Sequence, residues 1–389
     1  MSATVSLWLD QPYEAGPPLS EDLGCEVCVI GAGIGGIAVA WLLAQRGIEA
    51  VVLDARDVAS GASGRSGGFF IAGAAPMYDD MRRRWGRERA AAIYAGTLEA
   101  QLEMLAVAEA IGAREHFRMD GMLRLGVDAA EAEEVRAHHA ALREDGFSGE
   151  LIEEDGLPAA LRRPGRLGLL TPHDGGVHPV RWIRALAVAS GARIFEGTRV
   201  SGPPAARVDG VRIETEGGTV HARTVVVAMD GGLAGLVPAA HWVRPKRLNM
   251  VATASADPVL PHPVYARRGY EYAQQLPDGR VTLGGFSDLD GEASWTDVES
   301  VSAPVQARLA EYLREDLGVR SRVTHRWAGI VGYAEDPLPR CGPVPGSDGR
   351  ILALGGYNGT GHVQAWVAAR HVAAIVAGEH PSESPYATL

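Results

Sequence analysis

The sequence predicts an α/β protein that combines a Rossmann-like domain with a second, α+β domain built on a mixed or antiparallel sheet. Three observations support this fold class. A pattern of strand, glycine turn, helix and strand runs through residues 26–53, as in a βαβ unit. Another strand, glycine turn and helix fill residues 351–377. Between them, residues 248–286 are rich in short strands.

The individual elements follow the hydrophobic periodicity and the residues that break it. The apolar runs 26–30 and 50–53 have strand length, and the helix between them ends at Gly47. Further helices are predicted over 88–111, 128–144, 303–317 and 362–377. Further strands are predicted over 198–201, 211–216, 220–227 and 351–354, with a hairpin turn at Pro277-Asp278-Gly279.

These elements divide the chain into two discontinuous domains. The first is expected to contain residues 1–86, 151–230 and 326–389, and the second residues 87–150 and 231–325.

The composition excludes several classes of protein. The chain has 389 residues, of which 46% are apolar, so disorder is excluded. Glycine makes up 49 of these residues, about one in eight, whereas its usual share is ~7%. The glycines cluster near the two ends of the chain, which indicates close approach of the backbone to a bound molecule. The net charge is −11, Lys246 is the only lysine, and the arginines are scattered. We therefore expect no nucleic-acid partner.

The N-terminal region predicts neither secretion nor membrane insertion. No basic residue precedes Arg46, so a secretory signal is not expected. The uncharged run 27–45 is better explained by a strand, a turn and a helix than by a membrane span. Cys25 and Cys28 stand in a predicted strand, where their Cα atoms would lie ~10 Å apart, too far for a disulfide. We expect a cytoplasmic protein without a membrane partner.

The first glycine turn has the spacing of a dinucleotide-binding motif. Gly31 permits the tight turn, Gly33 lets the backbone approach a pyrophosphate, and Gly36 lets the helix pack on the strand. Asp54 ends the next strand, where it can accept hydrogen bonds from ribose hydroxyls. The helix N-terminus favours phosphate. The alternative is a purely structural glycine turn.

A second glycine loop, residues 61–68, follows the second strand. Ser63 and Ser66 can donate hydrogen bonds to phosphate, and Arg65 can neutralise it. Out of context, a flexible Gly/Ser loop would explain these residues as well.

With both motifs in place, the chain resembles the D-amino-acid-oxidase-like FAD-dependent oxidoreductases, which include glycine and sarcosine oxidases. The similarity lies in residues 27–70, in SLWLD at 6–10, in Trp327-Ala-Gly329, in Asp336-Pro-Leu-Pro339, in Gly342-Pro-Val344 and in GGYNGTGH at 355–362. The GASGRSGG form of the second loop is most similar to the γ-glutamylputrescine oxidase branch. The resemblance implies a Rossmann-like FAD-binding domain and a substrate domain whose sheet covers the flavin.

The resemblance also implies the residues that bind FAD, with the last glycine turn against the flavin pyrimidine and the following helix directed at its N1 and O2 atoms. These residues are Gly31, Gly33, Ile34, Gly35, Gly36, Asp54, Ala55, Arg56, Ala62, Ser63, Gly64, Arg65, Ser66, Gly67, Gly68, Val200, Ala228, Gly329, Gly356, Asn358, Gly359, Thr360, Gly361 and His362.

Some relatives attach the flavin covalently, through a Cys at the position of Gly329 or a His at the position of Arg65. Because neither residue is present, we expect non-covalent FAD.

The resemblance bears on the substrate as well. Glycine-oxidase-type members hold the substrate carboxylate with an Arg at the position of Val331, so an amine is expected rather than an α-amino acid. Arg267, Arg268 and Arg280 are candidates to replace that Arg, although surface arginines of a hairpin are the simpler interpretation.

The reaction implied is hydride transfer to flavin N5 from a carbon that bears an amine nitrogen, giving an imine. Sarcosine-oxidase-like members activate oxygen with a Lys at a position that here is Thr282, and Lys246 is too distant in sequence to be assumed to substitute. The electron acceptor, oxygen or another molecule, therefore stays open.

Five residues are expected around the substrate, with Asn358 near the flavin. Tyr270 and Tyr272 would form an aromatic wall on one strand face, and His362 would act as a base or donor. The others are Trp327 and Tyr333. Sheet core and a structural histidine are the alternatives. His138 and His139 are expected on a solvated helix face, His178 at a helix start, and no metal site is expected.

Three functions are compatible with these observations. The first is an FAD-dependent oxidoreductase for the C–N bond of a small amine, as a monomer or homodimer. The second is a flavin monooxygenase or halogenase, which would require reduction of the flavin by NAD(P)H. The third is a flavin-binding interaction protein without turnover.

Overall fold

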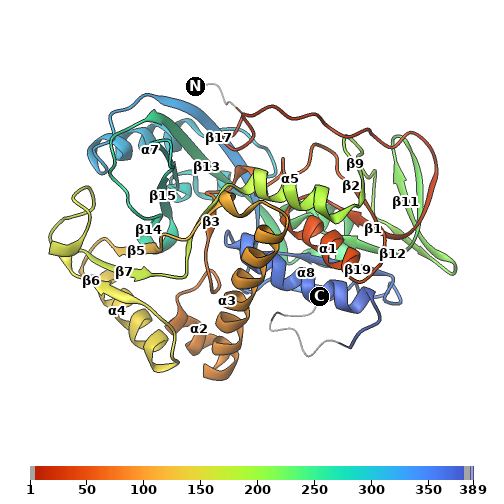
Figure 1. The fold of residues 1–389 in the computed structure, drawn as a ribbon, viewed down its shortest axis with the longest axis horizontal. Helices are drawn as coiled ribbons and strands as arrows, with labels where there is room; N and C mark the ends of the chain where they lie inside the picture. Colours follow the sequence, from red (N-terminus) through yellow and green to blue (C-terminus); the bar gives the residue numbers. More distant parts are fainter. Residues whose placement is uncertain (1–4, 381–385, 387–388) are drawn as a thin grey trace.

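The computed structural model describes residues 5–380, 386 and 389. Two large sheets lie side by side (Figure 1), with β1, β12 and β19 in one of them and β13, β14 and β15 in the other. Both have eight strands.

The first sheet has the order β10-β11-β12-β1-β2-β9, with β19 beside β12 and β18 beside β19. β12, β1, β2 and β9 run parallel to one another, as does β19 to β12. The strands are β1 (Leu23–Ile30), β2 (Ala50–Leu53), β9 (Arg193–Phe195), β10 (Ala205–Arg207), β11 (Gly210–Thr215), β12 (Gly218–Val227), β18 (Arg340–Pro343) and β19 (Ile351–Gly355). Three helices, α1 (Ile34–Ala44), α5 (Pro179–Ser190) and α8 (Gly361–Val376), cover one face.

The second sheet has the order β17-β13-β16-β15-β14-β5-β7-β6. Its strands are β5 (Met122–Gly126), β6 (Glu150–Ile152), β7 (Leu167–Thr171), β13 (Val243–Ser255), β14 (Val264–Ala266), β15 (Glu271–Gln275), β16 (Arg280–Gly284) and β17 (Val323–Ala334). The apolar residues of one face, including Val251, Val281 and Leu283, pack against helix α7 (Ala303–Glu315). Because side chains alternate along a strand, the other face is free to form the cavity described below.

Smaller elements join the two sheets. A three-stranded sheet has the order β3-β8-β4, from β3 (Phe69–Phe70), β8 (Gly175–Val177) and β4 (Phe117–Arg118). The remaining helices are α2 (Tyr78–Trp85), α3 (Arg87–Ala110), α4 (Ala129–Glu144) and α6 (Leu233–Leu236). α3 packs against α8, and α4 against β5, so this layer lies across both sheets (Figure 1).

Most predicted elements are confirmed, with ends that shift by a few residues. The predicted βαβ unit corresponds to β1, α1 and β2, and the hairpin at 277–279 joins β15 to β16. His178 does begin a helix, because its side chain accepts a hydrogen bond from the N–H of Arg181 at the start of α5.

Two structural predictions are wrong. Residues 198–201 form no strand: Val200 makes only an isolated bridge to Thr215, while the Thr198 N–H donates to the Asp54 carbonyl, so the segment is bound to separate elements. His138 is buried rather than solvated, because its Nδ1 accepts the N–H of Tyr78 at 2.7 Å. Burial also holds the pKa of His138 well below its usual value.

The division into two domains remains a proposal, and the strand pairing shifts its boundaries. β7 and all but the first residue of β6 lie within the predicted first-domain segment 151–230, yet both strands pair in the second sheet. The same sheet contains β17, most of which lies in the predicted first-domain segment 326–389. We therefore propose that residues 151–171 and 326–334 belong to the second domain.

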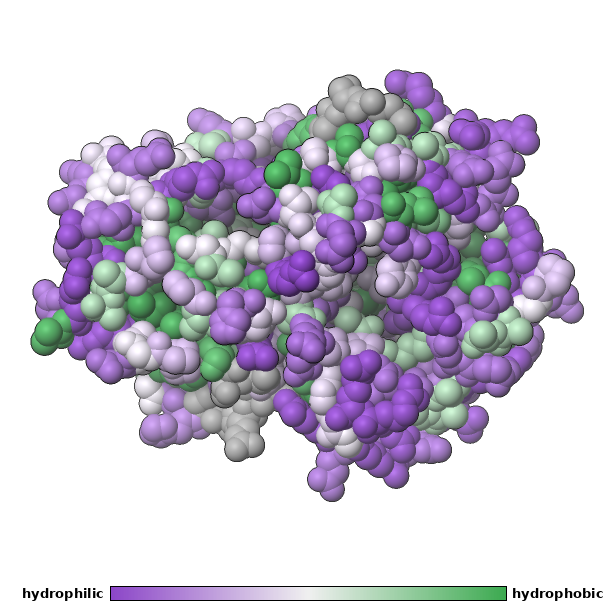
Figure 2. Space-filling model, turned by 180° about the vertical axis from the view of Figure 1, so that it is seen from behind, coloured by the Kyte–Doolittle hydropathy of each residue, from purple (hydrophilic) through white to green (hydrophobic). Residues whose placement is uncertain are grey.

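The surface is mostly hydrophilic on the face shown in Figure 2, where apolar residues form small groups. No helix among the described residues is long and apolar enough to cross a membrane. The three cysteines are free thiols, as expected.

Candidate active site

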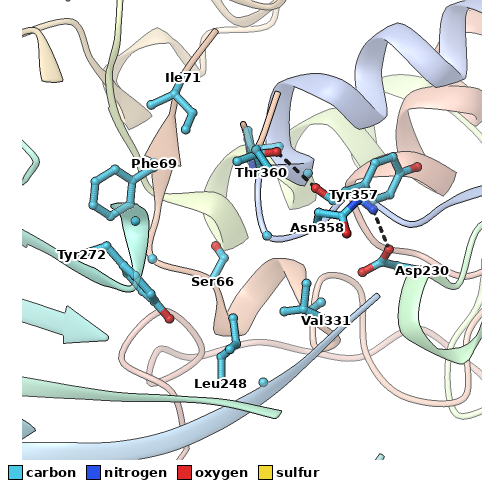
Figure 3. Close-up of a pocket in the computed structure, with 18 of the residues that line it drawn as sticks. Ser66, Phe69, Ile71, Asp230, Leu248, Tyr272, Val331, Tyr357, Asn358 and Thr360 are labelled. Atoms are coloured by element: carbon cyan, nitrogen blue, oxygen red, sulfur yellow. Dashed lines mark hydrogen bonds between the residues drawn. The ribbon is translucent and has the colours of Figure 1, made fainter. Parts of the chain in front are cut away.

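A cavity of about 350 Å³ lies between the two sheets. Figure 3 shows Phe69 and Tyr272 on one side of it and Tyr357, Asn358 and Thr360 on the other. One wall consists of glycine turns from the first sheet, and the opposite wall is the free face of the second sheet.

The first glycine turn brings the N-terminus of α1 to the cavity. Gly31 has a φ of +108°, and a Cβ there would lie 2.6 Å from the carbonyl oxygen of Ala228. At Gly36 a Cβ would overlap the carbonyl oxygen of Gly31, so α1 can pack this closely only on a glycine. Gly33, Ile34 and Gly35 line the cavity. The positive end of α1 is thereby directed at the cavity, where it would favour an anion.

Asp54 lies beside this turn at the end of β2. Its Oδ2 accepts the N–H of Ala32 at 2.7 Å, and its Oδ1 accepts the N–H of Arg56 at 2.8 Å. These bonds fix the orientation of the carboxylate, although burial raises its pKa. Each oxygen retains a lone pair that can accept from a ribose hydroxyl.

The second glycine loop lies under the second sheet. Ser63 accepts the N–H of Ile34 on its Oγ at 3.1 Å, which connects this loop to the start of α1. Arg65 forms an ion pair with Glu299 at 3.1 Å and donates to the carbonyl oxygen of Ser60. A Cβ at Gly329 would lie only 2.9 Å from the Cβ of Arg65, so the loop and β17 are in close contact.

The last glycine turn precedes α8. Asn358 has a φ of +52°, and its Oδ1 accepts the N–H of Ala334 in β17 at 2.9 Å. Gly359 has a φ of +87°, and a Cβ there would lie 3.2 Å from the Tyr333 hydroxyl. Gly361 begins α8, which has no side-chain cap, so a second helix N-terminus is directed at the cavity.

Asp230 joins this turn to the second sheet. Its carboxylate accepts the N–H groups of Gly332 at 2.8 Å, Gly356 at 3.0 Å and Tyr357 at 3.4 Å. The residue has a φ of +45°, which is unusual for aspartate. Asp230 was not predicted, because its sequence, Met-Asp-Gly-Gly, shows only a turn.

Three aromatic rings form the wall opposite the turns. The ring centroids of Phe69 and Tyr265 are 4.7 Å apart, and those of Phe69 and Tyr272 are 6.1 Å apart. Tyr265 and Tyr272 are direct partners in the β14–β15 pairing, so they project from the same face. Tyr270 precedes β15 rather than lying in it, and it is 45% exposed, yet it also lines the cavity.

Lys246 reaches the cavity despite its distance in sequence from the other candidates. It is paired with Val331 between β13 and β17, and both side chains line the cavity. Its Nζ lies 5.1 Å from the ring centroid of Trp295 and 5.2 Å from that of Tyr333. Burial lowers the pKa of Lys246. Thr282 does not line the cavity; its hydroxyl is buried and has no hydrogen-bond partner among the residues that the structure describes.

His362 lines the cavity at the start of α8. Burial lowers its pKa to about 4, so the imidazole is neutral near pH 7. Its Nε2 is buried and has no hydrogen-bond partner in the described chain. The imidazole of His362 can therefore act as a neutral hydrogen-bond donor or acceptor, and not as a cation, near pH 7.

The structure brings most of the predicted residues together. Those that line the cavity are Gly33, Ile34, Gly35, Ala62, Ser63, Arg65, Ser66, Gly67, Ala228, Tyr270, Tyr272, Gly329, Tyr333, Asn358, Gly359, Thr360, Gly361 and His362. Those outside the lining are Gly31, Gly36, Asp54, Ala55, Arg56, Gly64, Gly68, Val200, Trp327 and Gly356. Trp327 is a core residue that packs with Met250 and donates from Nε1 to the Arg65 carbonyl at 3.0 Å.

Sequence reasoning missed several lining residues. Phe69 stands directly after the second glycine loop, so its position was a usable signal. No sequence signal pointed to Arg124, Tyr265 or Leu248, because only the pairing of distant strands brings these residues to the cavity.

Two helix N-termini that face one cavity, with a fixed acidic residue after the second strand, define a protein of the dinucleotide-binding class. The sequence profile of the family described as "FAD dependent oxidoreductase" matches residues 26–375, and the chain belongs to this family. The predicted flavoprotein oxidoreductase with FAD as its cofactor is thereby confirmed.

Individual relatives agree with this assignment. The chain is 28% identical to "Probable oxidoreductase OrdL" of Rhizobium meliloti, over 86% of this chain and 79% of that protein. It is 25% identical to γ-glutamylputrescine oxidoreductase of Escherichia coli, over 95% of this chain and 88% of that protein. The crystal structure of glycine oxidase from Geobacillus kaustophilus superimposes with a TM-score of 0.79 at 22% identity, covering 92% and 96% of the two chains. The predicted fold class is confirmed.

Proposed function

We propose that the protein oxidises the C–N bond of a small amine to an imine, with FAD held along the glycine turns. The cavity itself carries this proposal. It is bounded by two helix N-termini on one wall and by aromatic rings on the other. Relatives named as glycine oxidase and γ-glutamylputrescine oxidoreductase support the same class of reaction.

The residues present fit FAD. At Gly33, Gly67 and Gly359 a Cβ would point at cavity-lining side chains, namely Ser63, Phe69 and Tyr333, so glycine keeps room for a bound molecule. The start of α1 would hold the pyrophosphate, and Asp54 the adenosine ribose. The start of α8, at Thr360 and Gly361, would stabilise negative charge on the flavin ring. When bound, FAD supplies the two-electron acceptor.

FAD is proposed to be held without a covalent bond. Gly329 and Arg65 occupy the positions at which relatives form such a bond, and they pack against each other. Gly329 has no side chain, and the guanidinium of Arg65 is not a group that forms a bond to flavin carbon. Acid precipitation should release all of the flavin into the supernatant.

An amine would bind between the flavin site and the aromatic wall formed by Tyr265, Tyr272 and Phe69. No carboxylate in the described lining is free to take a proton, because Asp230 already accepts three N–H groups. His362, in the first turn of α8, is neutral near pH 7. We infer that the amine reacts in its unprotonated form.

The decisive experiment is anaerobic reduction of the bound flavin by polyamines, N-methyl amines and amino acids, followed by admission of oxygen. We expect at least one amine to bleach the flavin, with a rate that rises between about pH 6 and about pH 10 as the amine loses its proton. Fast reoxidation identifies an oxidase, and slow reoxidation a dehydrogenase. Bleaching by NADPH without any amine would instead support a monooxygenase.

A further inference from the structure

The connection between β16 and α7 contains an acidic segment, residues 287–300, which we call the strap. Five of its fourteen residues are Asp or Glu, and none is Lys or Arg. Phe286, directly before the strap, packs in the core beneath the second sheet, with its ring centroid 5.5 Å from that of Tyr312. Ser302, just after the strap, donates its N–H to the side-chain oxygen of the buried Asn249 at 2.9 Å. Both ends of the strap are therefore fixed to the second sheet.

Arg247 in β13 holds the middle of the strap on the same sheet. Its guanidinium pairs with Asp290 at 3.1 Å, and it donates to the carbonyl oxygen of Ala293 at 3.1 Å and to the hydroxyl of Ser300 at 2.9 Å. The side chains of Arg247 and Asp290 are only 12% and 7% exposed. Because salt screens a buried pair weakly, we expect the strap to stay on the second sheet when the ionic strength is raised.

Glu299, near the end of the strap, reaches the first sheet instead. Its carboxylate pairs with Arg56 at 2.9 Å and with Arg65 of the second glycine loop at 3.1 Å. Arg56 follows β2, and its N–H donates to Asp54, the carboxylate expected to bind ribose. The side chains of Glu299 and Arg56 are 27% and 43% exposed, so these ion pairs lie at the surface, where salt weakens them.

The strap also runs along the rim of the cavity. Its first residue, Ser287, lines the cavity. Trp295 contacts two lining residues, because its ring centroid lies 5.1 Å from Nζ of Lys246 and 6.1 Å from the ring centroid of Tyr333. Glu299 then reaches the second glycine loop on the opposite wall. The strap is thus fixed to one wall of the cavity and bound to the other through a single carboxylate.

We propose that the strap closes the FAD site, and that Glu299 is a latch that must release Arg56 and Arg65 before FAD enters or leaves. This inference goes beyond amine oxidation, and it rests on the proposed non-covalent binding of FAD. The two arginines stand beside the residues expected to hold the ribose and the pyrophosphate. The closed latch keeps the two walls together on this side of the cavity, so a molecule as large as FAD passes when the ion pairs break.

The first test measures exchange of the bound flavin in the holoenzyme. Radiolabelled FAD is added in excess, and its incorporation into the protein is followed after desalting. We expect Glu299→Gln to exchange at least about threefold faster, which is the size expected from the loss of two surface ion pairs. The matched control is Asp297→Asn, which removes the same charge from an exposed strap residue that has no ion pair within the described part of the chain. It should exchange at the wild-type rate.

The direction of the change distinguishes a latch from a simple effect of charge. Removal of a negative charge beside a phosphate site would by itself bind FAD more tightly and slow its release. The latch predicts that Glu299→Gln speeds both the uptake of FAD by the flavin-free protein and its release from the holoenzyme. Release that is slower than in wild type, or equal to it, would overturn the proposal.

The second test uses salt. Raising NaCl from about 0.05 M to about 0.5 M shortens the distance over which surface charges interact, and should therefore weaken the latch. We expect flavin exchange to accelerate more in wild type than in Glu299→Gln, because the variant retains only the salt dependence of the phosphates of FAD. An equal salt dependence of the two proteins would assign the whole effect to those phosphates and contradict the latch.

Acid precipitation separates failure of the latch from failure of the proposed flavin attachment. Flavin that stays with the denatured protein would show a covalent bond, which overturns non-covalent binding and the latch together. Flavin that is released by acid, yet exchanges equally in wild type and in Glu299→Gln, overturns the latch alone. Neither result depends on which amine the protein oxidises, so the proposed reaction is tested separately by flavin reduction.

Discussion

The carboxylate of Asp230 accepts a hydrogen bond from the backbone N–H of Gly356 at 3.0 Å, across 126 residues of chain. It also accepts the N–H of Gly332 in β17 at 2.8 Å. Together with the bond from the Ala334 N–H to Asn358, this side chain holds the last glycine turn against the edge of the second sheet. We expect the spacing of the two cavity walls to depend on these bonds.

We expect Asp230→Asn to lower both stability and flavin retention. An amide presents an acceptor on one side only, so at least one buried N–H loses its partner, at a cost of about 1–3 kcal/mol. Urea unfolding and the flavin-to-protein absorbance ratio measure the two effects. Asp257→Asn, at an exposed position, serves as the control and should change neither. An Asp230→Asn protein with normal stability and flavin content would contradict this role of Asp230.

Gly36→Ala should abolish flavin binding, because its Cβ would overlap the carbonyl oxygen of Gly31. The turn or the helix would have to move, which displaces the proposed phosphate site. Gly96→Ala provides a matched control within helix α3, where a Cβ meets no atom within 4 Å. That control should stabilise the protein by about 1 kcal/mol. Flavin content and thermal unfolding of the two variants, measured in parallel, distinguish the cofactor effect from a general glycine effect.

His362→Gln should leave the pH dependence of flavin reduction in place. The pKa of His362 is lowered to about 4 by burial, so its protonation is complete only in acid and cannot produce a rise in rate at neutral or alkaline pH. The rise is assigned to the substrate amine. Stopped-flow reduction of wild type and variant across the pH range tests this. Loss of the alkaline rise in the variant would show that His362 is the titrating group.

Glu271 should make the protein less stable as the pH rises from about 4.5 to about 7. Burial raises the pKa of Glu271 to about 7, so the folded state holds the proton that the unfolded chain has already released. The stability that is present below the unfolded pKa is therefore lost as the pH passes through the folded value, by an amount on the order of 3 kcal/mol.

Glu271→Gln should remove most of this loss and raise stability above neutral pH. Chemical unfolding of wild type and variant at acid and at mildly alkaline pH measures the difference. An equal decline of both proteins with pH would assign the effect to another group.

The glycine-rich segments were predictable because their meaning is local. The spacing of Gly31, Gly33 and Gly36 between a strand and a helix determines a turn geometry without reference to the rest of the chain. The cavity wall that the second sheet forms was harder to predict from the sequence. Lys246 and Val331 meet only through the β13–β17 register, and a shift by one residue would turn both away from the cavity.

The same reason explains the errors. Tyr270 and Tyr272 have strand spacing, but β15 begins at Glu271, so only Tyr272 is held by the ladder. His138 has the polar neighbours of a surface residue, yet α4 packs its histidine against the start of α2. Sequence periodicity predicts which residues lie on the same face of a helix or strand, but it does not predict what packs against that face.

The position of Lys246 has a practical consequence. Since the chain has no other lysine, reagents that acylate or alkylate side-chain amines have one target, and that target faces the cavity. The extent of labelling, read as a mass increase on a single peptide, would report directly on whether the cavity is filled. Coupling the protein to a surface through its lysine would, by the same geometry, obstruct the cavity rather than leave it open.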